Sequence, residues 1–560
     1  MSSEPRERGV PWAALAAALA VCQAGLLLST AWDKSDTADE PYYLSSALSQ
    51  WTQGNFDETC DAPALPRWGF AAALRLADPP LFDASARLGR DPLWSRPLPQ
   101  TRINLLAARA ATIGVTVAGG LLVWLAARRF GAFAGFVAHA LWCFSPSVLA
   151  SGALATLDAW AASASALVML AAVRHLERPG TVRAASLGGA LGLAAACKVT
   201  TLGLAPVALG LAAWAASRPR RGRWGRMAVH GGVLVGGLVL ALWAVYGFSL
   251  GIVDTGRPCG RSLAEAGYRL GPLPFAPWLE GALLQWRHGS QGHLSYLFGR
   301  TGSDGWWWFY LAALALKTTL GAQLLYLLLG LGVVGLAWRR ELALDVAILG
   351  YPALLLAAMS LGRAQNGIRY LLPAFPLTFL WAARASELAT RRFGSRARLA
   401  ILIALGLGTF ESLAVHPHHL MFFNLWAGGP IGGPRYLIDS DDWGQDQRRL
   451  AAWQAENRPW RLYYTYYNGR PAHWGIHFEP PPCEPAPGFY ALQAVEVHRP
   501  KRIAAGCLDW LTVEPPDARL GYSIYLYQVS RPRLERLRAE ADTPTPFWRS
   551  RGQVRGHDEP

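Results

Sequence analysis

Charged side chains are scarce in this chain. Asp, Glu, Lys and Arg make up 16% of its 560 residues, whereas hydrophobic residues make up 52%. A soluble globular protein carries about a quarter charged residues. Apolar runs of the ~20 residues that a membrane-spanning helix needs recur along the sequence. The composition therefore excludes an ordinary soluble enzyme and indicates a polytopic α-helical membrane protein.

Lysine is rarer still, since only Lys34, Lys198, Lys317 and Lys501 occur and arginine supplies the other basic side chains. The formal net charge is +15, but the arginines gather in short segments between apolar runs and not in one patch. Such segments encode the topology of a membrane protein. The positive charge is therefore no sign of nucleic-acid binding, and no nucleic-acid partner is expected.

The chain has seven cysteines but no CxxC motif. Cys22, Cys143 and Cys197 fall in apolar runs, where a small buried thiol is the usual finding. Four more fall in regions expected outside the cytoplasm: Cys60, Cys259, Cys483 and Cys507. Of these, Cys483 with Cys507 is a candidate disulfide, and the pairing stays open.

Eleven segments are expected to cross the membrane: 11–31, 103–127, 133–149, 157–173, 184–196, 200–216, 227–250, 306–338, 342–361, 370–383 and 399–415. With this count the arginine clusters at 128–129, 218–226 and 391–398 all fall on one side, as the positive-inside rule requires. The N-terminus is then inside and the C-terminus outside. No internal repeat is evident, which argues against an inverted-repeat transporter.

Two domains are expected. Residues 1–415 form the membrane domain, with outer loops at 32–100 and 251–305, and residues 416–560 form a small extracytoplasmic α/β domain. In the second domain, short aromatic and β-branched runs predict strands over 461–467, 488–497 and 522–529, and 445–456 predicts a helix. The charged tail after Arg531 is expected to fray.

The first outer loop carries two adjacent carboxylates, Asp39 and Glu40, just before Pro41. Proline favours the first helical position and Asp favours the cap. Apolar residues then recur at helical spacing: Leu44, Ala47, Leu48 and Trp51. This pattern predicts a short amphipathic helix at the membrane surface. The carboxylates either cap this helix or carry out chemistry at the level of the lipid headgroups.

Six motifs follow one another along the chain. They are DEPYYLSSALSQWTQGNF with DAPALPRW, LATLDAW, AAACKVTTLGLAP, GWWWFYLAALALKTTL, NGIRYLLPAFP, and HPHHLMFFNLWAGGPIGGPRYLIDSDDWGQDQRRLAAW. In this order they resemble the membrane-embedded GT-C glycosyltransferases. The nearest branch is the bacterial one related to protein O-mannosyltransferases and to the transferases that modify lipid A with aminoarabinose. Two departures occur: Ala62 stands where the Pro-rich segment usually has His, and DSDDWGQD is one residue short.

The resemblance implies a reaction that moves a sugar from a polyprenyl-phosphate donor to a hydroxyl acceptor at the outer face of a bacterial inner membrane. It makes Asp39 the general base, with Glu40 beside it. Asp158 and Asp61 would bind the acceptor or order the site. The donor phosphate would meet basic side chains: Arg67, Lys198, Lys317 and Arg369. No cofactor is implied, because the lipid-linked donor is a substrate, and the chain has no Gly-rich nucleotide loop.

Simpler roles remain open for several of these residues. Asp158 also suits a helix cap, Lys198 could snorkel to the interface, and Arg369 could anchor a helix there. Trp306, Trp307 and Trp308 suit an interfacial aromatic belt. The cluster of His416, His418 and His419 is expected to be a junction between domains and not a metal site, although a metal requirement is unknown.

Two other functions remain as alternatives. One is a transporter or flippase of a lipid-linked sugar, in which buried charges mark a pathway. The other is an inactive relative that binds a partner through its soluble domain, against which the intact Asp39 and Glu40 argue. The sugar (hexose or pentose), the acceptor (protein or glycolipid) and the oligomeric state stay open.

Overall fold

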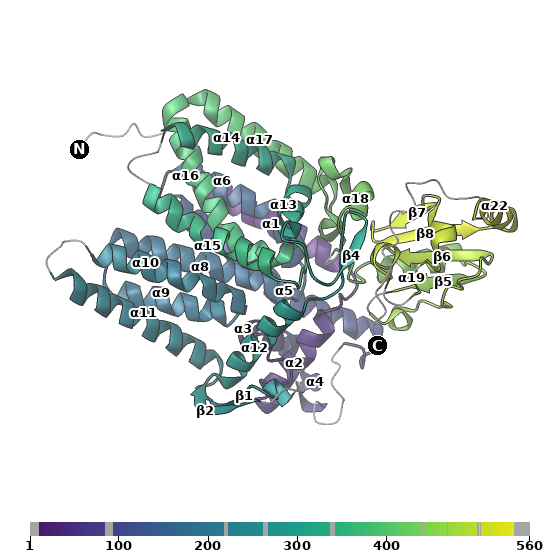
Figure 1. Cartoon of the computed structure of the whole chain (residues 1–560), viewed down its shortest axis with the longest axis horizontal. Helices are drawn as coiled ribbons and strands as arrows, with labels where there is room; N and C mark the ends of the chain where they lie inside the picture. Colours follow the sequence, from purple (N-terminus) through teal and green to yellow (C-terminus); the bar gives the residue numbers. More distant parts are fainter. Residues whose placement is uncertain are drawn as a thin grey trace.

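The computed structural model describes residues 11–84, 93–217, 222–260, 267–336, 342–438, 441–466, 469–500, 503–504 and 506–541. A bundle of long helices makes up the larger part, and a small sheet lies at one end of it (Figure 1). Of the residues used to predict topology, 218–221 and the end of the segment 306–338, residues 337–338, lie outside the described residues, and so does the end of the predicted frayed tail, 542–560.

The bundle is built from α1 (Trp12–Asp33), α5 (Leu98–Ala127), α6 (Ala132–Cys143), α7 (Pro146–Gly152), α8 (Leu157–Glu177), α9 (Thr181–Ala195), α10 (Leu204–Ala216), α11 (Arg223–Val245), α13 (Phe309–Lys317), α14 (Leu320–Leu336), α15 (Leu342–Leu361), α16 (Phe375–Phe393) and α17 (Ser395–Ala414). Short 3-10 helices intervene: η1 (Val199–Gly203), η2 (Pro258–Gly260), η3 (Ile368–Ala374), η4 (His419–Met421), η5 (Leu425–Ala427), η6 (Gly433–Arg435) and η7 (Pro471–Trp474).

Six helical spans in the described chain are long and apolar enough to cross a membrane, or eight if two bent pairs each count once. The bent pairs are α6 with α7, at 58°, and α13 with α14, at 109°. A helix occupies each of the eleven predicted segments. The count of eleven crossings, and the orientation that follows from it, stay predictions, because α9 is only 15 residues long and α15 and α16 do not pass on length and composition.

Glycines allow α9 and α11 to pack with their backbones almost in contact. A Cβ atom added at Gly188 would lie 2.0 Å from the carbonyl oxygen of Leu234, and one at Gly192 would lie 2.4 Å from that of Leu238. Small residues at such positions are how helices associate closely inside membranes. Lys198 lies shortly after the end of α9, so this packing also fixes the position of the Lys198 backbone.

The outer segments are ordered by their own helices, short strands and one disulfide. They comprise α2 (Glu40–Gln53), α3 (Ala64–Ala77), α4 (Pro79–Ala84), β1 (Leu250–Asp254), β2 (Arg269–Pro274), α12 (Ala276–Gln291), β3 (Ser295–Leu297) and β4 (Arg300–Gly302). Strands β1 and β2 pair antiparallel, as do β3 and β4. A disulfide between Cys60 and Cys259, a pairing that the sequence left open, joins the two outer loops.

Helix α2 confirms the predicted amphipathic helix of the first loop. Leu44 and Ala47 are fully buried in one apolar cluster with Phe70 of α3 and Leu105 of α5, whereas Trp51 is exposed. Gly54 ends the helix in the left-handed conformation, with φ of 64°, which glycine adopts at no steric cost. The start of α2, where Asp39 lies, is therefore held against the bundle.

The C-terminal region folds around a four-stranded sheet of order β5-β6-β8-β7, in which only β5 and β6 are parallel. Its elements are α18 (Gly429–Gly432), α19 (Gln447–Asn457), β5 (Leu462–Thr465), β6 (Gly488–Gln493), α20 (Ala494–His498), α21 (Asp509–Thr512), β7 (Ala518–Leu520), β8 (Ile524–Val529) and α22 (Arg531–Ala541). Helix α19 and strands β5, β6 and β8 confirm the predicted elements, and Cys483 and Cys507, a candidate pair whose bonding the sequence left open, form a disulfide.

Two boundaries in this region differ from the prediction. The strand predicted over 488–497 ends at Gln493, because α20 begins there and the Asp442 carboxylate accepts a hydrogen bond from the Val495 N–H at 3.1 Å. The tail predicted to fray begins instead with α22, and Arg533 of that helix pairs with Glu514 and Asp517. Both contacts come from residues distant in sequence.

Candidate active site

Asp39 lies at the N-terminus of α2 but does not cap it. Its side chain makes no capping hydrogen bond, and its Oδ2 instead accepts one from Nη1 of Arg369 at 3.0 Å. The side chain stays 31% exposed. The Asp39 side chain therefore does not have the capping role that the sequence left open. Because it is part exposed, the carboxylate remains within reach of a substrate.

Glu40, the next residue, is completely buried. Its two carboxylate oxygens accept hydrogen bonds from Nε and Nη2 of Arg109, each at 2.7 Å, and others from Thr37 and the Ala155 N–H. Burial alone would raise the pKa of Glu40, but Arg109 and the backbone N–H groups outweigh it, and the pKa lies below its usual value. Glu40 has no surface with which to touch a substrate, so its geometry suits positioning and not the reactive role predicted beside Asp39.

Arg109 was not predicted as part of the site. It is fully buried, and besides Glu40 it donates to the carbonyl oxygens of Ala31, Lys34 and Ser35. One arginine thus fixes the end of α1 and the turn that leads to Asp39. The signal in the sequence was a single charge within the apolar run of α5, which in a membrane segment marks a buried partner.

Arg369 brings Asp39 and Asp158 together. Its Nη1 lies 3.0 Å from Oδ2 of Asp39 and 3.6 Å from Oδ2 of Asp158. The other carboxylate oxygen of Asp158 pairs with Nζ of Lys198 at 2.5 Å. Two carboxylates and two cations thus alternate along a chain of contacts. We call Asp39, Arg369, Asp158 and Lys198 the charge relay group, and the sequence predicted all four.

Each member of this group lies where a helix starts or stops. Asp158 is in the first turn of α8, and Lys198 has an extended backbone between α9 and η1. Arg369 is the second residue of η3. Such breaks place polar side chains at the ends of apolar helices. Lys198 does not snorkel outward but turns to Asp158 and lies 4.2 Å from the ring centre of Tyr370.

A cavity of about 550 Å³ opens beside the charge relay group. Arg369, Asp158 and Lys198 line it, and so do aromatic and polar side chains that include Tyr42, Tyr43, Asp61, Trp286, His288 and Tyr370. Asp61, a predicted site residue, accepts a hydrogen bond from the Tyr42 hydroxyl at 3.1 Å. Val199, Met359 and Leu361 also line the cavity, so it combines two cations with an apolar wall.

Lys317 lies apart from the other predicted cations. Its Nζ pairs with Oδ1 of Asp441 at 2.6 Å and donates to the carbonyl oxygen of Leu420 at 3.1 Å. It lines a second, mainly apolar cavity of about 310 Å³ among α6, α13, α14, α16 and α17. A narrow gap of about 30 Å³ lies between it and the charge relay group, lined by Lys317, Asp158 and Arg369.

Arg67 is not brought to either cavity. It is fully buried, and its Nη2 donates to the carbonyl oxygen of Phe56 at 3.4 Å. Neither cavity counts it among its lining residues. Because it is buried away from both cavities, Arg67 has no direct contact with a donor phosphate, the role predicted for it. A basic residue after a proline does not reveal from the sequence alone that its side chain will be buried.

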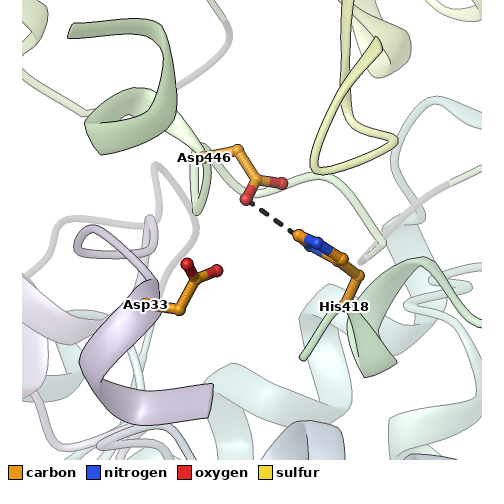
Figure 2. Close-up of side chains that lie close together, drawn as sticks. All are labelled: Asp33, His418 and Asp446. Carbon is orange, nitrogen blue, oxygen red and sulfur yellow. Dashed lines mark ion pairs between the residues drawn. The ribbon is translucent and has the colours of Figure 1, made fainter. Parts of the chain in front are cut away.

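In the described part of the chain, one group of side chains has metal-ligand spacing: Asp33, His418 and Asp446 (Figure 2). The ammonium of Lys34 already lies among them, 2.6 Å from Oδ1 of Asp446 and 2.5 Å from Nδ1 of His418. Burial, together with Lys34 and Arg449, lowers the pKa of His418 to about 3, so the neutral ring accepts a hydrogen bond from the lysine ammonium. Lys34, which follows α1, thus links His418 to Asp446 of the C-terminal region, and the junction role expected of the histidine cluster stays a prediction.

No protein-family model and no curated protein sequence matches this chain. Among solved structures, it is similar to the Saccharomyces cerevisiae protein O-mannosyltransferase Pmt1-Pmt2 complex bound to the sugar donor, at a TM-score of 0.50 and 10% identity over 73% of this chain and 90% of that one. ArnT from Cupriavidus metallidurans bound to undecaprenyl phosphate gives 0.47 and 13% identity over 92% and 97% of the two chains. The likeness to the Pmt1-Pmt2 complex shows a shared fold.

Proposed function

We propose, from the GT-C fold of this chain and the charge relay group within it, a membrane glycosyltransferase that uses a polyprenyl-phosphate sugar. The observation that carries the proposal is the contact between Asp39 and Arg369, next to Lys198 and beside a cavity. Glycosyl transfer from a phosphate needs a base for the acceptor and cations for the leaving group. This group supplies both within a few ångströms.

The donor phosphate would bind at the guanidinium of Arg369 and the ammonium of Lys198. Both line the larger cavity, and a planar guanidinium suits two phosphate oxygens at once. In the transfer, the bond between the anomeric carbon and the phosphate oxygen breaks, and its electrons go to the phosphate. The two cations stabilise the charge that develops there. The apolar wall formed by Val199, Met359 and Leu361 suits the start of the polyprenyl chain.

Asp39 would take the proton of the acceptor hydroxyl as its oxygen attacks the anomeric carbon. Of the two carboxylates of the charge relay group, Asp39 is the more exposed, at 31% against 6% for Asp158. Asp158 holds both cations and would order them. Asp61, which lines the same cavity and is hydrogen-bonded to Tyr42, would meet the acceptor or the sugar.

The remaining predicted residues take other roles in this proposal. Glu40 and Arg109 fix the turn before Asp39, and Lys317 holds Asp441 of the C-terminal region. The two disulfides lie in segments predicted to be outside the cytoplasm, which agrees with an oxidising compartment and a site at the outer face. No observation favours a transporter. The sugar and the acceptor stay open, and no cofactor is part of the proposal.

The experiment is turnover of lipid-linked sugars by the purified protein in detergent or nanodiscs. A panel of polyprenyl-phosphate hexoses and pentoses, each labelled in the sugar, is incubated with the protein and with envelope lipids or peptides. We expect one sugar to move to an acceptor while free polyprenyl phosphate forms. If every labelled donor stays intact and none competes with bare polyprenyl phosphate for binding, the proposal is wrong.

A further inference from the structure

The C-terminal region reaches into the charge relay group through one side chain. The indole ring of Trp443 packs on the guanidinium of Arg369, whose carbon lies 3.9 Å from the ring centre. Trp443 is only 7% exposed. A guanidinium on a desolvated indole face is among the stronger cation–π contacts. Trp443 was not predicted as a site residue.

The segment that carries Trp443 is bonded to the chain just before Asp39. The carbonyl oxygen of Trp443 accepts from the Ala38 N–H at 3.1 Å, and that of Gln445 accepts from the Ser35 N–H at 2.9 Å. The Ser35 hydroxyl donates to the Gly444 carbonyl oxygen at 2.8 Å. One short segment therefore holds the turn just before Asp39 through its backbone and contacts Arg369 through a ring.

The segment is itself fixed from within. The Gln445 side chain accepts from the Trp443 N–H at 2.7 Å and donates to the Asp441 carbonyl oxygen at 2.7 Å. Asp441 in turn pairs with Lys317 of the membrane bundle. The place of the indole is thus set by contacts independent of Arg369, as a positioning residue requires.

The geometry of the stack matters for the reaction. An arginine donates its hydrogen bonds in the plane of the guanidinium, whereas the central carbon of the Arg369 guanidinium lies over the Trp443 ring, 3.9 Å from its centre, as stacking on the face requires. Arg369 can therefore exchange Asp39 for a phosphate oxygen at its edge while the face contact persists. Without the ring, departure of Asp39 would leave the side chain with two weaker polar contacts, to Asp158 at 3.6 Å and to the Asn366 carbonyl oxygen at 3.4 Å. Because the indole is neutral, the positive charge of Arg369 stays available to a phosphate, whereas a carboxylate in place of the ring would neutralise it.

We infer that Trp443 is a positioning residue that holds Arg369 by its face, so that the guanidinium edge is free to pass from Asp39 to the donor phosphate. This inference rests on the proposed function, because it takes a phosphate as the incoming ligand. It also makes the C-terminal region a part of the reaction site and not a separate module.

The test measures binding of a polyprenyl phosphate to the full-length protein in detergent, with the polyprenyl alcohol as the probe that lacks the phosphate. Trp443→Met and Trp443→Phe fill similar space, but only the second keeps an aromatic face. We expect the Met variant to weaken phosphate binding by roughly tenfold to thirtyfold, as loss of a buried cation–π contact implies, and the Phe variant to recover most of it. Trp510→Leu removes an equally buried indole, packed on Tyr490 away from Arg369, and should leave binding unchanged.

A second series of variants tests the same contact even if the Met variant does not fold. Tryptophans with one to four ring fluorines at position 443 keep the shape and drain the ring of electron density. Binding should then weaken step by step with each fluorine. A flat series, or equal losses in the Met, Phe and Trp510→Leu proteins, would overturn the inference. Wild-type protein that binds the phosphate no better than the alcohol would instead overturn the proposed function.

Discussion

Asp39 and Glu40 share a peptide bond, yet their side chains belong to two different kinds of charge cluster. Glu40 meets Arg109 in the interior, where neither side chain has any exposed surface and backbone N–H groups complete the carboxylate. Asp39 meets Arg369 beside a cavity and stays 31% exposed. A carboxylate and an arginine thus have two different roles. The fully buried pair of Glu40 with Arg109, here called the closed pair, fixes the chain. The part-exposed pair of Asp39 with Arg369, the open pair, can still bind a ligand.

The comparison separates structural from reactive charges more sharply than residue type does. A second closed cluster, in which Lys34 contacts both Asp446 and His418, is built in the same way as the pair of Glu40 with Arg109. Three members of the charge relay group, Arg369, Asp158 and Lys198, line the larger cavity, and Asp39 is paired with the first of them. Breaking a closed pair should therefore lower the stability of the protein but leave the turnover of the folded fraction unchanged. Breaking the open pair should lower turnover or phosphate binding but leave the stability unchanged.

Arg109→Leu should have the largest effect on stability. It leaves the Glu40 carboxylate buried without its cation, which typically costs about 3–5 kcal/mol. Thermal unfolding in detergent measures the loss. The double variant Glu40→Leu with Arg109→Leu should recover part of it, because no buried charge then remains unpaired. An Arg109→Leu protein as stable as wild type would show that the closed pair does not hold the turn.

Asp36, in the same turn, should make stability depend on pH. It is buried, and both of its oxygens accept hydrogen bonds from indoles, those of Trp94 and Trp474, whereas Arg109, the cation that favours its charged form, is paired with Glu40. Burial above all raises the pKa of Asp36 to about 6, with the Trp474 hydrogen bond opposing the shift and the Glu40 charge adding to it. Between about pH 4 and pH 6 the folded protein holds this proton and the unfolded chain does not, so stability falls as pH rises, by about 3 kcal/mol in total.

The Asp36→Asn protein isolates that contribution. An amide does not titrate in this range, so the difference in melting temperature between wild type and variant should change with pH between about 4 and 6 and be constant above. Wild type gains relative to the variant on the acid side. Parallel melting curves at all pH values would show that Asp36 is ionised in the folded protein, contrary to the account of its burial.

Arg369→Lys should have a smaller effect, confined to the open cluster. The charge remains, but the planar edge and the stack on Trp443 are lost. We expect the affinity for polyprenyl phosphate to fall by at least about thirtyfold, near 2 kcal/mol, because more is lost than in Trp443→Met, at an unchanged melting temperature. The matched control is Arg363→Lys, since Arg363 is more than half exposed and its nearest charge, on Asp304, lies 3.8 Å away. Equal affinities in all three proteins would remove Arg369 from the phosphate site.

The sequence predicted the parts of the site that follow from local pattern. The helices, their order and the four members of the charge relay group all came from apolar runs and motifs. Arg109, Lys34 and Trp443 were missed because their partners are distant in the chain, as with Lys34 and Asp446, 412 positions apart. The sequence also did not predict which of these side chains are buried. The first motif presented Asp39, Glu40 and Arg67 alike as candidate site residues, and only the packing of the folded chain distinguishes the exposed Asp39 from the buried Glu40 and Arg67.

The measurement that tests the central claim most directly is turnover by Asp39→Asn beside Asp33→Asn. Both carboxylates are ion-paired and part exposed, 31% for Asp39 and 23% for Asp33, but Asp33 pairs with Arg449 at the junction and not with Arg369. Removal of a general base typically costs about two to four orders of magnitude in rate. We predict that loss for Asp39→Asn alone, with the melting temperature and the binding of polyprenyl phosphate retained. Turnover by Asp39→Asn close to that of wild type would contradict the account.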